Sequence, residues 1–273
     1  MTALRGQLRE SVPMARYTTW RVGGPAERLY EPADADDLGA FLASDQAAEP
    51  LFWLGLGSNL LVRDGGLRGS VIRLHRGLAS LQDLGDGRVQ ADAGVPCAKL
   101  ARWCGRRGYA GAEFFAGIPG TVGGALAMNA GAWGGETWAR VESVSTVDRQ
   151  GLTHRRLPEE FEVSYRHVRG QADEWFTSAT FRFQPGGDPD VLKARVRSLL
   201  VERAETQPTG MASGGSVFRN PPGDHAARLI EAAGLKGHRL GGAWVSEKHA
   251  NFIVHGGEAR AADIESLIHF VQS

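Results

Sequence analysis

Two glycine-rich stretches of this sequence have a composition suited to binding a diphosphate. The first is GLGSNL (Gly55–Leu60), which follows an apolar segment, and the second is GIPGTVGG (Gly117–Gly124). Glycine lets the backbone approach a ligand closely, and successive backbone N–H groups can surround an anion. Either stretch alone is also typical of a tight turn. Their joint occurrence favours a pair of loops that hold a diphosphate.

Two well-known phosphate-binding patterns do not fit these loops. A P-loop requires GxxxxGK[ST], and no GK[ST] occurs anywhere in the chain. The dinucleotide pattern GxGxxG begins well at Gly55, but Leu60 stands where its third glycine should be. The segment that follows is strand-like rather than helical. The sequence therefore argues against both a P-loop fold and a Rossmann fold.

The composition narrows the class of protein. The chain has 273 residues, of which 42% are hydrophobic and 23% charged, as in an ordinary globular protein of two or three parts. Its 31 basic and 31 acidic residues balance, so charge indicates neither a nucleic-acid nor a membrane partner. No signal-peptide run or membrane-spanning segment is found, and we expect a cytoplasmic protein. The two cysteines, Cys97 and Cys104, are predicted to be reduced core thiols, with no metal site.

Hydrophobic periodicity predicts the elements that position the loops. A helix is expected within residues 33–44, a strand, turn and strand over 51–74, and a strand at 88–94. A helix then opens at Pro96 and stops at Gly108, before the glycine-rich stretch. Three further strands are expected at 141–148, 152–157 and 175–183, the last with Ala179, Phe181 and Phe183 on one face.

A break at QPGGDPD (residues 184–190) starts the last part of the chain. Asp188 is a plausible N-cap and Pro189 a first-turn proline. The predicted helix carries an apolar stripe made of Val191, Leu192, Val196, Leu199 and Leu200. A second helix capped by Asp224, a strand at 251–255 and a helix at 261–272 follow. The mixture predicts an α+β fold.

Six motifs occur in order along nearly the whole chain: TTWRVGGPA, LGLGSNLLVRD, GIPGTVGGALAMNAGAWG, SYRH, TQPTGMASGGSVFRNPP, and AGLKG followed by GGAWVSEKHANFIV. Together they resemble the UDP-N-acetylenolpyruvoylglucosamine reductase family, flavoenzymes that complete UDP-N-acetylmuramate for the bacterial cell wall. The resemblance implies a two-part FAD-binding region of the vanillyl-alcohol-oxidase type, over residues 1–75 and 76–187. It also implies an α+β substrate-binding domain over 188–273, and a role in peptidoglycan synthesis, cell shape and cell division.

The same resemblance assigns both glycine-rich loops to FAD. It implies that NADPH supplies a hydride, which FAD carries to the enolpyruvyl group of a UDP-sugar. The residues expected to contact FAD are Gly55, Leu56, Gly57, Ser58, Asn59, Leu60, Gly117, Ile118, Pro119, Gly120, Thr121, Val122, Gly123, Gly124, Asn129 and Gly131.

Two residues match the family's catalytic groups. Arg166, in SYRH, matches an arginine whose guanidinium suits a carboxylate that gains charge during the reaction. Ser216, in GGSVFRNP, matches a serine that protonates the substrate carbon. Without the resemblance, a surface arginine and a turn serine would be the ordinary interpretations. Substrate binding is expected from Tyr165, Arg219, Asn220, Lys236, Lys248, His249 and Asn251.

One departure from the family pattern bears on the activity, and two alternatives to that activity stay open. Family members continue past the last helix to a strand that carries a catalytic glutamate, whereas this sequence stops at Ser273 and neither Glu258 nor Glu265 fits the motif. The substrate domain is therefore expected to lack its last segment. The missing glutamate favours a non-catalytic protein that binds FAD or a UDP-sugar, against which stand the intact Arg166, Ser216 and loops. An FAD oxidoreductase of the same fold with another substrate is the second alternative, and SGGSVFRNP and VSEKHANF argue against it.

Overall fold

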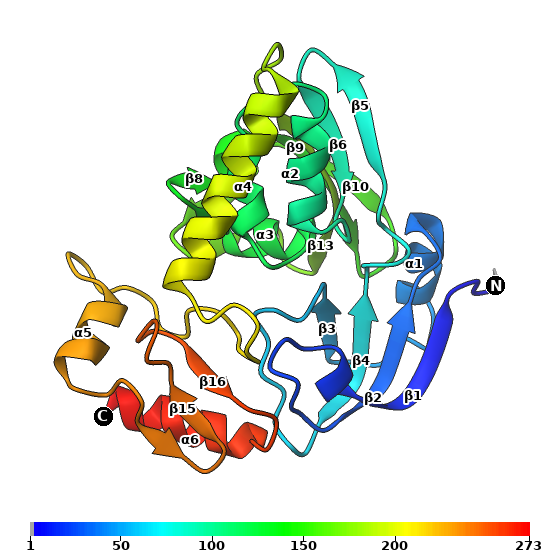
Figure 1. Cartoon of the computed structure of the whole chain (residues 1–273). Coiled ribbons are helices and arrows are strands. Elements are labelled where there is room, and N and C mark those ends of the chain that lie inside the picture. Colours follow the sequence, from blue (N-terminus) through cyan, green and yellow to red (C-terminus); the bar gives the residue numbers. More distant parts are fainter. Residues whose placement is uncertain (1–2) are drawn as a thin grey trace. The chain divides into compact units, whose positions relative to one another are not determined.

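The computed structural model describes residues 3–273, which fold as two compact units (Figure 1). The first unit consists of residues 3–9, Arg28–Leu56 and Gly69–Leu200. The second unit consists of Glu10–Glu27, Gly57–Arg68 and Val201–Ser273. No helix in this described range is both long and apolar enough to span a bilayer.

A four-stranded sheet is formed near the N-terminus with the order β1-β2-β4-β3. Its strands are β1 (Gln7–Pro13), β2 (Pro25–Glu31), β3 (Leu51–Leu54) and β4 (Leu67–Arg73). The predicted strand, turn and strand of residues 51–74 are confirmed as β3 and β4, which pair in parallel. Helix α1 (Ala35–Leu42) begins where the Asp34 side chain accepts a hydrogen bond from the Asp37 N–H, as expected of an N-cap.

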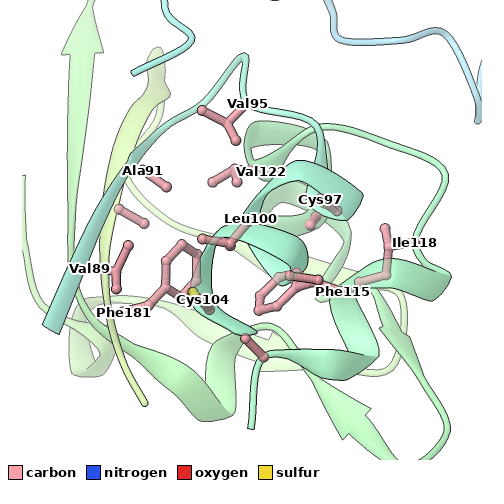
Figure 2. Packing of buried hydrophobic residues seen from close by; sticks show 14 of the residues in the cluster. Val89, Ala91, Val95, Cys97, Leu100, Cys104, Phe115, Ile118, Val122 and Phe181 are labelled. Atoms are coloured by element: carbon pink, nitrogen blue, oxygen red, sulfur yellow. The ribbon is translucent and has the colours of Figure 1, made fainter. Parts of the chain in front are cut away.

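The five-stranded sheet of the first unit has the order β10-β9-β13-β6-β5. Its strands are antiparallel: β5 (Leu81–Gly85), β6 (Arg88–Asp92), β9 (Val141–Asp148), β10 (Thr153–Arg156) and β13 (Glu174–Arg182). The predicted apolar face is confirmed, because Ala179, Phe181 and Phe183 are all buried. Figure 2 shows Val89, Ala91 and Phe181 of this sheet with Leu100 and Phe115 in one hydrophobic cluster.

Both cysteines belong to this cluster. They lie on α2 (Cys97–Gly105), seven residues apart and therefore on one helical face. Cys97 and Cys104 are buried free thiols, as predicted. Burial raises the pKa of both thiols far above the ordinary value, so they remain protonated and unreactive.

The segment that begins with the second glycine-rich stretch, residues 117–136, has more regular secondary structure than its composition suggests. It contains α3 (Val122–Met128) and a small hairpin of β7 (Gly131–Ala132) and β8 (Gly135–Glu136), neither of which was expected from the sequence. Thr121 caps α3, since its side-chain oxygen accepts from the Gly124 N–H at 3.4 Å. Asn129 ends the helix with a left-handed φ of 41°, a conformation that asparagine tolerates well.

Helix α4 (Pro189–Thr206) begins at the predicted place. The Asp190 N–H donates to Asp188 Oδ1 at 2.8 Å, in keeping with Asp188 as the cap. The predicted stripe is narrower than expected. Leu192, Val196 and Leu199 are buried, but Val191 is 62% and Leu200 41% exposed. The two exposed residues lie beside the stripe rather than in it, because residues one position apart on a helix point in different directions.

The C-terminal part of the second unit is built on a three-stranded sheet with the order β14-β15-β16. Its elements are α5 (Ala226–Ala232), β14 (Arg239–Leu240), β15 (Ala243–Val245), β16 (Ile253–His255) and α6 (Ala261–Gln272). The prediction that Asp224 caps α5 is wrong. His225 occupies the N-cap position, and Asp224 instead accepts hydrogen bonds from Arg228, one helical turn further along.

Candidate functional site

The first unit contains a cavity of about 630 Å³. Its walls come from the end of β3, the start of α3, the start of β13, and a short hairpin formed by β11 (Glu162–Ser164) and β12 (His167–Arg169). Most of the lining side chains are apolar or absent, so the cavity suits a large and mainly non-polar ligand. Gly55, Thr121, Gly123 and Gly124 of the two glycine-rich loops lie in the wall.

Gly123 and Gly124 contribute to the wall in different ways. A Cβ at Gly123 would lie 2.9 Å from the Ala93 Cβ, so the close approach of two protein segments requires glycine there. A Cβ at Gly124 would meet only Thr121 Oγ1, at 3.8 Å. The absence of a side chain at Gly124 therefore keeps space open in the cavity.

The backbone amides of this loop are mostly engaged within the protein. Val122 N–H donates to Val95 O at 2.8 Å, and Gly123 N–H donates to Ala93 O at 2.8 Å. These two amides are not the bare donors that the sequence led us to expect. At Val122 and Gly123, the start of α3 therefore offers no free N–H group to a ligand.

The first loop is also shaped by close packing. A Cβ at Gly55 would lie 2.4 Å from Thr121 Oγ1, so Gly55 allows the end of β3 to approach the start of α3. Gly57 has a φ of +67°, and its carbonyl accepts from the Thr19 N–H at 3.0 Å. The chain passes from the first unit to the second between Leu56 and Gly57. Beyond Gly55, none of the residues predicted in this loop lines the cavity.

Asn129 and Gly131, both predicted to contact FAD, hold the small β7–β8 hairpin. The buried Asn129 side chain donates to Glu136 Oε2 and accepts from the Trp138 N–H, both at 3.1 Å. A Cβ at Gly131 would lie 2.4 Å from the Gly135 carbonyl oxygen. The structure thus gives both residues an internal role.

Arg166 lies at the tip of the β11–β12 hairpin. Ser164 pairs with His167, which leaves Tyr165 and Arg166 as the two turn residues. Arg166 has a φ of +51°, the sign that tight hairpin turns require of at least one turn residue. Its guanidinium carbon lies 5.9 Å from the centre of the Tyr165 ring. The tip therefore presents a cation and an exposed phenol together.

The base of the same hairpin is anchored in the core. Phe161, just before β11, packs against Trp138 and Phe176 with ring centres 4.7 and 5.6 Å apart. Val168 of β12 also packs against that cluster, and both Phe161 and Val168 line the cavity. A two-stranded hairpin has little stability of its own. These anchors connect the position of Arg166 to the cavity wall.

The one acidic side chain of the cavity wall is neutralised by a neighbour. Glu174 accepts from Arg156 at 2.5 Å and from the Thr146 hydroxyl at 2.6 Å. The hydrogen bond from Arg156 is the main cause that lowers the pKa of Glu174. Glu174 stays ionised and paired, and it adds little repulsion toward an anionic ligand.

Ser216, in the second unit, follows Gly215, which has a φ of +79°, and forms an isolated β-bridge with Phe252. The buried Asn251 side chain holds this segment. Its Oδ1 accepts from the Phe218 N–H at 2.8 Å, and its Nδ2 donates to the Phe218 carbonyl at 2.9 Å. Asn251, predicted to bind substrate, positions the Ser216 segment.

The remaining residues predicted to bind substrate form a mixed group in the second unit. Asn220 accepts from the Ala226 N–H at 3.1 Å and so supports the start of α5. Lys236 pairs with Glu231 at 2.8 Å, and Lys248 donates to the Ala204 carbonyl. Arg219 is exposed. His249 is half-buried, and burial is the main cause that lowers its pKa.

Comparisons with known proteins decide the family. A family model described as UDP-N-acetylenolpyruvoylglucosamine reductase, C-terminal domain, matches residues 207–273, and one described as FAD binding domain matches residues 26–156. The UDP-N-acetylenolpyruvoylglucosamine reductase of Alkalilimnicola ehrlichii is 64% identical over 267 residues, which cover 98% of this chain and 89% of that protein. This chain belongs to the UDP-N-acetylenolpyruvoylglucosamine reductase family.

Further comparisons agree with this assignment to the reductase family. The reductase of Methylococcus capsulatus is 60% identical over 264 residues, which cover 97% of this chain and 86% of that protein. The crystal structure of the reductase from Thermus caldophilus matches with a TM-score of 0.86 at 36% identity, covering 99% of this chain and 95% of that one. The predicted α+β architecture is confirmed.

The lining of the cavity is chemically compatible with FAD. The matched FAD binding domain includes Gly55 and all of Gly117–Gly124. The apolar wall suits flat ring systems, and the missing side chain at Gly124 keeps space open in the cavity.

Sequence reasoning missed several cavity residues of the reductase. Trp53, Phe161, Val168, Glu174 and Trp175 line the cavity, but none belongs to a glycine-rich loop. The only local signal is at Trp53, which lies two residues before Gly55 and therefore on the same side of an extended strand. The others come from segments that only the fold brings together.

Proposed function

We propose that this chain uses NADPH to reduce the enolpyruvyl group of UDP-N-acetylenolpyruvoylglucosamine and so produces UDP-N-acetylmuramate. The observation that carries the proposal is the 64% identity to a reductase of that name over 98% of the chain. The match to an FAD binding domain supports FAD as the cofactor. The cavity of the first unit supplies a site of suitable size and polarity for it.

Within this proposal, the cavity binds and orients FAD. Gly55, Thr121, Gly123 and Gly124 would border its diphosphate, and the apolar side chains would hold its ring systems. When bound, FAD takes up hydride from NADPH and gives it to the enolpyruvyl double bond. The protein's own task is to orient the substrate, stabilise the charge that develops on it and supply a proton.

Arg166 is proposed to bind the substrate carboxylate. Addition of hydride to the terminal carbon places negative charge on the carbon next to that carboxylate, and the charge is shared with the carboxylate oxygens. A guanidinium donates two parallel hydrogen bonds to such a group and binds it more strongly as the charge grows. The position of Arg166 at the tip of an anchored hairpin supports this role.

Ser216 is proposed to give its hydroxyl proton to the substrate carbon next to the carboxylate. A serine hydroxyl is a weak acid, but an enolate carbon is a strong base, so a correctly placed hydroxyl suffices. The backbone pairing with Phe252 and the Asn251 hydrogen bonds favour a fixed position for this residue. Tyr165, Arg219, Asn220, Lys236, Lys248 and His249 are proposed to bind the substrate or NADPH.

The proposal also covers the division of labour along the chain and the cellular role. Residues 1–75 and 76–187 would form the two FAD-binding parts, and 188–273 the substrate-binding part. The product is a precursor of peptidoglycan, so the enzyme would act in the cytoplasm and contribute to cell shape and cell division. Small molecules would be its partners, rather than nucleic acid or membrane.

Anaerobic absorbance measurements on the purified holoenzyme test the proposed function. NADPH should bleach the flavin band, and UDP-N-acetylenolpyruvoylglucosamine should then restore it. The reaction mixture should contain UDP-N-acetylmuramate by mass spectrometry. Bleaching without restoration would contradict the assigned substrate, and a protein that neither holds nor takes up FAD would contradict the proposal as a whole.

A further inference from the structure

Two tryptophans in the cavity wall are not explained by the glycine-rich loops. Trp53 is in β3 and Trp175 is in β13, and their rings are stacked with centres 5.0 Å apart and planes 25° apart. Both are half-buried, and both line the cavity. Far apart in the sequence, they are brought together only by the fold.

Because the ring nitrogen of Trp53 is buried, this residue offers its ring carbon surface to the cavity. Trp53 Nε1 is buried and has no hydrogen-bond partner among residues 3–273. Two polar groups of the wall, the Thr146 hydroxyl and the Glu174 carboxylate, are bonded to one another, and Glu174 also accepts from Arg156. An aromatic surface of this kind favours stacking with a flat, uncharged ring system.

FAD has two flat ring systems, one on each side of its diphosphate. The cavity wall likewise has two parts, because neighbouring side chains of β13 pack against different clusters. Trp175 and Phe176 are neighbours on this strand and therefore point to opposite faces. Phe176 packs with Phe161 at the base of the hairpin that carries Arg166. Trp175 packs with Trp53 against a different hydrophobic cluster, which includes Tyr30, Phe41 and Ile72.

The reacting ring must lie near the residue that binds the substrate carboxylate. Under the proposed function, that residue is Arg166, on the Phe161 and Phe176 side of the wall. The ring that takes no part in the chemistry then falls to the tryptophan side. We propose that Trp53 and Trp175 form the binding surface for the adenine ring of FAD and make the site selective for FAD over FMN.

The test uses apo-enzyme prepared by releasing the flavin, and three probes. FAD contains both rings, FMN contains only the flavin, and ADP contains only the adenine. FAD and FMN binding is measured by quenching of flavin fluorescence, and ADP binding by competition with FAD, so that only the FAD site is reported. The variants are Trp53→Leu and Trp175→Leu, with Trp53→Phe as the conservative replacement.

Trp103→Leu is the matched control. Trp103 is a partly buried tryptophan of the same unit, on α2, and its ring lies under the guanidinium of Arg107 at 3.6 Å, outside the cavity wall. Thermal unfolding of each apo-variant checks that the substitutions leave the fold intact.

Loss of one stacked ring should weaken FAD and ADP binding by about 10- to 100-fold, the range found for base–aromatic stacking. FMN binding should stay within about 2-fold, because FMN has no adenine ring. Trp53→Phe should restore most of the FAD affinity, because phenylalanine keeps an aromatic ring surface at that position. Trp103→Leu should leave all three affinities unchanged. Equal weakening of FAD and FMN, or unchanged ADP binding, would overturn the assignment.

Wild-type protein provides a measurement that needs no variant. ADP should compete with FAD at least about 10-fold more strongly than inorganic pyrophosphate, which shares the diphosphate but has no adenine. Equal competition would overturn the assignment. The inference rests on the proposed function in taking FAD as the cofactor. Failure of the wild type to bind FAD would reject that function, whereas FAD binding that ignores both tryptophans would reject this inference alone.

Discussion

The cavity of the first unit and the Ser216 segment of the second unit are held in place by different kinds of interaction. The cavity wall is made of strands and a helix start that pack closely, as at Gly55 and Gly123, where no side chain fits. Ser216 lies in a segment with no regular strand of its own, and the buried Asn251 side chain bonds the N–H and the carbonyl of Phe218, two residues further along. The cavity wall depends on close packing, whereas the Ser216 segment adds a few polar bonds to the packing of Val217 and Phe218 against the hydrophobic cluster of the second unit.

The difference has a consequence for mutational sensitivity. Removing one apolar contact from a closely packed wall has a graded effect, because the neighbours remain in place. Removing one member of a small hydrogen-bonded set leaves its buried partners unsatisfied. Single polar substitutions near Ser216 should therefore act mainly on substrate chemistry, and substitutions in the cavity mainly on FAD affinity.

The largest effect is expected for Ser216→Ala. Reduction of the bound flavin by NADPH should keep its wild-type rate, because the hydroxyl takes no part in that step. Reoxidation by the enolpyruvyl substrate should slow by about 10²- to 10⁴-fold, the usual contribution of a general acid. Stopped-flow absorbance measures the two half-reactions separately. Equal slowing of both would mean that Ser216 supports the flavin site rather than donating a proton.

The next effect is expected for Asn251→Ala, which removes both hydrogen bonds to the Phe218 backbone. The variant should lose about 2 kcal/mol of stability in urea unfolding, because a part-buried N–H and a part-buried carbonyl of Phe218 lose their partner. Substrate-dependent flavin reoxidation should slow as well, since Ser216 is no longer held.

Asn220→Ala is the matched control for stability. Its amide is exposed and accepts one bond from the Ala226 N–H at the start of α5, so its loss should cost about 1 kcal/mol, as for a helix cap. A larger loss of stability in Asn220→Ala than in Asn251→Ala would contradict the role given to Asn251. FAD affinity should remain unchanged in both.

The sequence was informative where one local rule decides the outcome. Asp188 was recognisable as a helix cap, and the alternation of Ala179, Phe181 and Phe183 was enough to find the buried face of β13. Gly55, Gly123 and Gly124 of the two glycine-rich loops line the cavity, and their contact with FAD stays a prediction.

It was misleading where a distant partner decides. Gly123 was expected to bare its amide to a ligand, but its N–H is bonded to the Ala93 carbonyl, and Ala93 lies about thirty residues earlier in the chain. Helix α3 was missed because its glycines interrupt the hydrophobic periodicity that predicts a helix. Here tertiary packing overrides the low helix propensity of glycine. In the sequence, Trp53 and Trp175 are each typical of ordinary strand residues, and only the folded structure brings them together as a pair.

A smaller effect, confined to the cavity, is expected for Gly124→Ala. A methyl group there has room within the protein, so stability should be unchanged or slightly raised, as for Gly→Ala in a helix. The same methyl group occupies cavity space, and FAD affinity should fall by about 10-fold.

Gly65→Ala is the matched control for that change, because a Cβ there has no neighbour within 4 Å and Gly65 does not line the cavity. Flavin fluorescence titration of the two apo-variants measures the difference. If Gly65→Ala and Gly124→Ala bind FAD equally well, the start of α3 does not border the cofactor.

The smallest effect is expected from the titration of His249, a residue of the second unit. Its pH dependence should distinguish this residue from the cavity of the first unit. Burial is the main cause that lowers the pKa of His249, with a further lowering by Lys236 and an opposing effect of Glu231. The folded state therefore disfavours the charged imidazole. The contribution of the neutral His249 to the free energy of unfolding is complete above the ordinary histidine pKa of about 6.5. It is lost as the pH falls through the lower pKa that His249 has in the folded state. Urea unfolding of wild type between pH 7.5 and 5 should show declining stability, and His249→Gln, which cannot titrate, should decline less. Gly124→Ala should follow the wild-type pH profile, because it alters only the cavity. Identical profiles for wild type and His249→Gln would mean that His249 is solvated enough to titrate alike in both states.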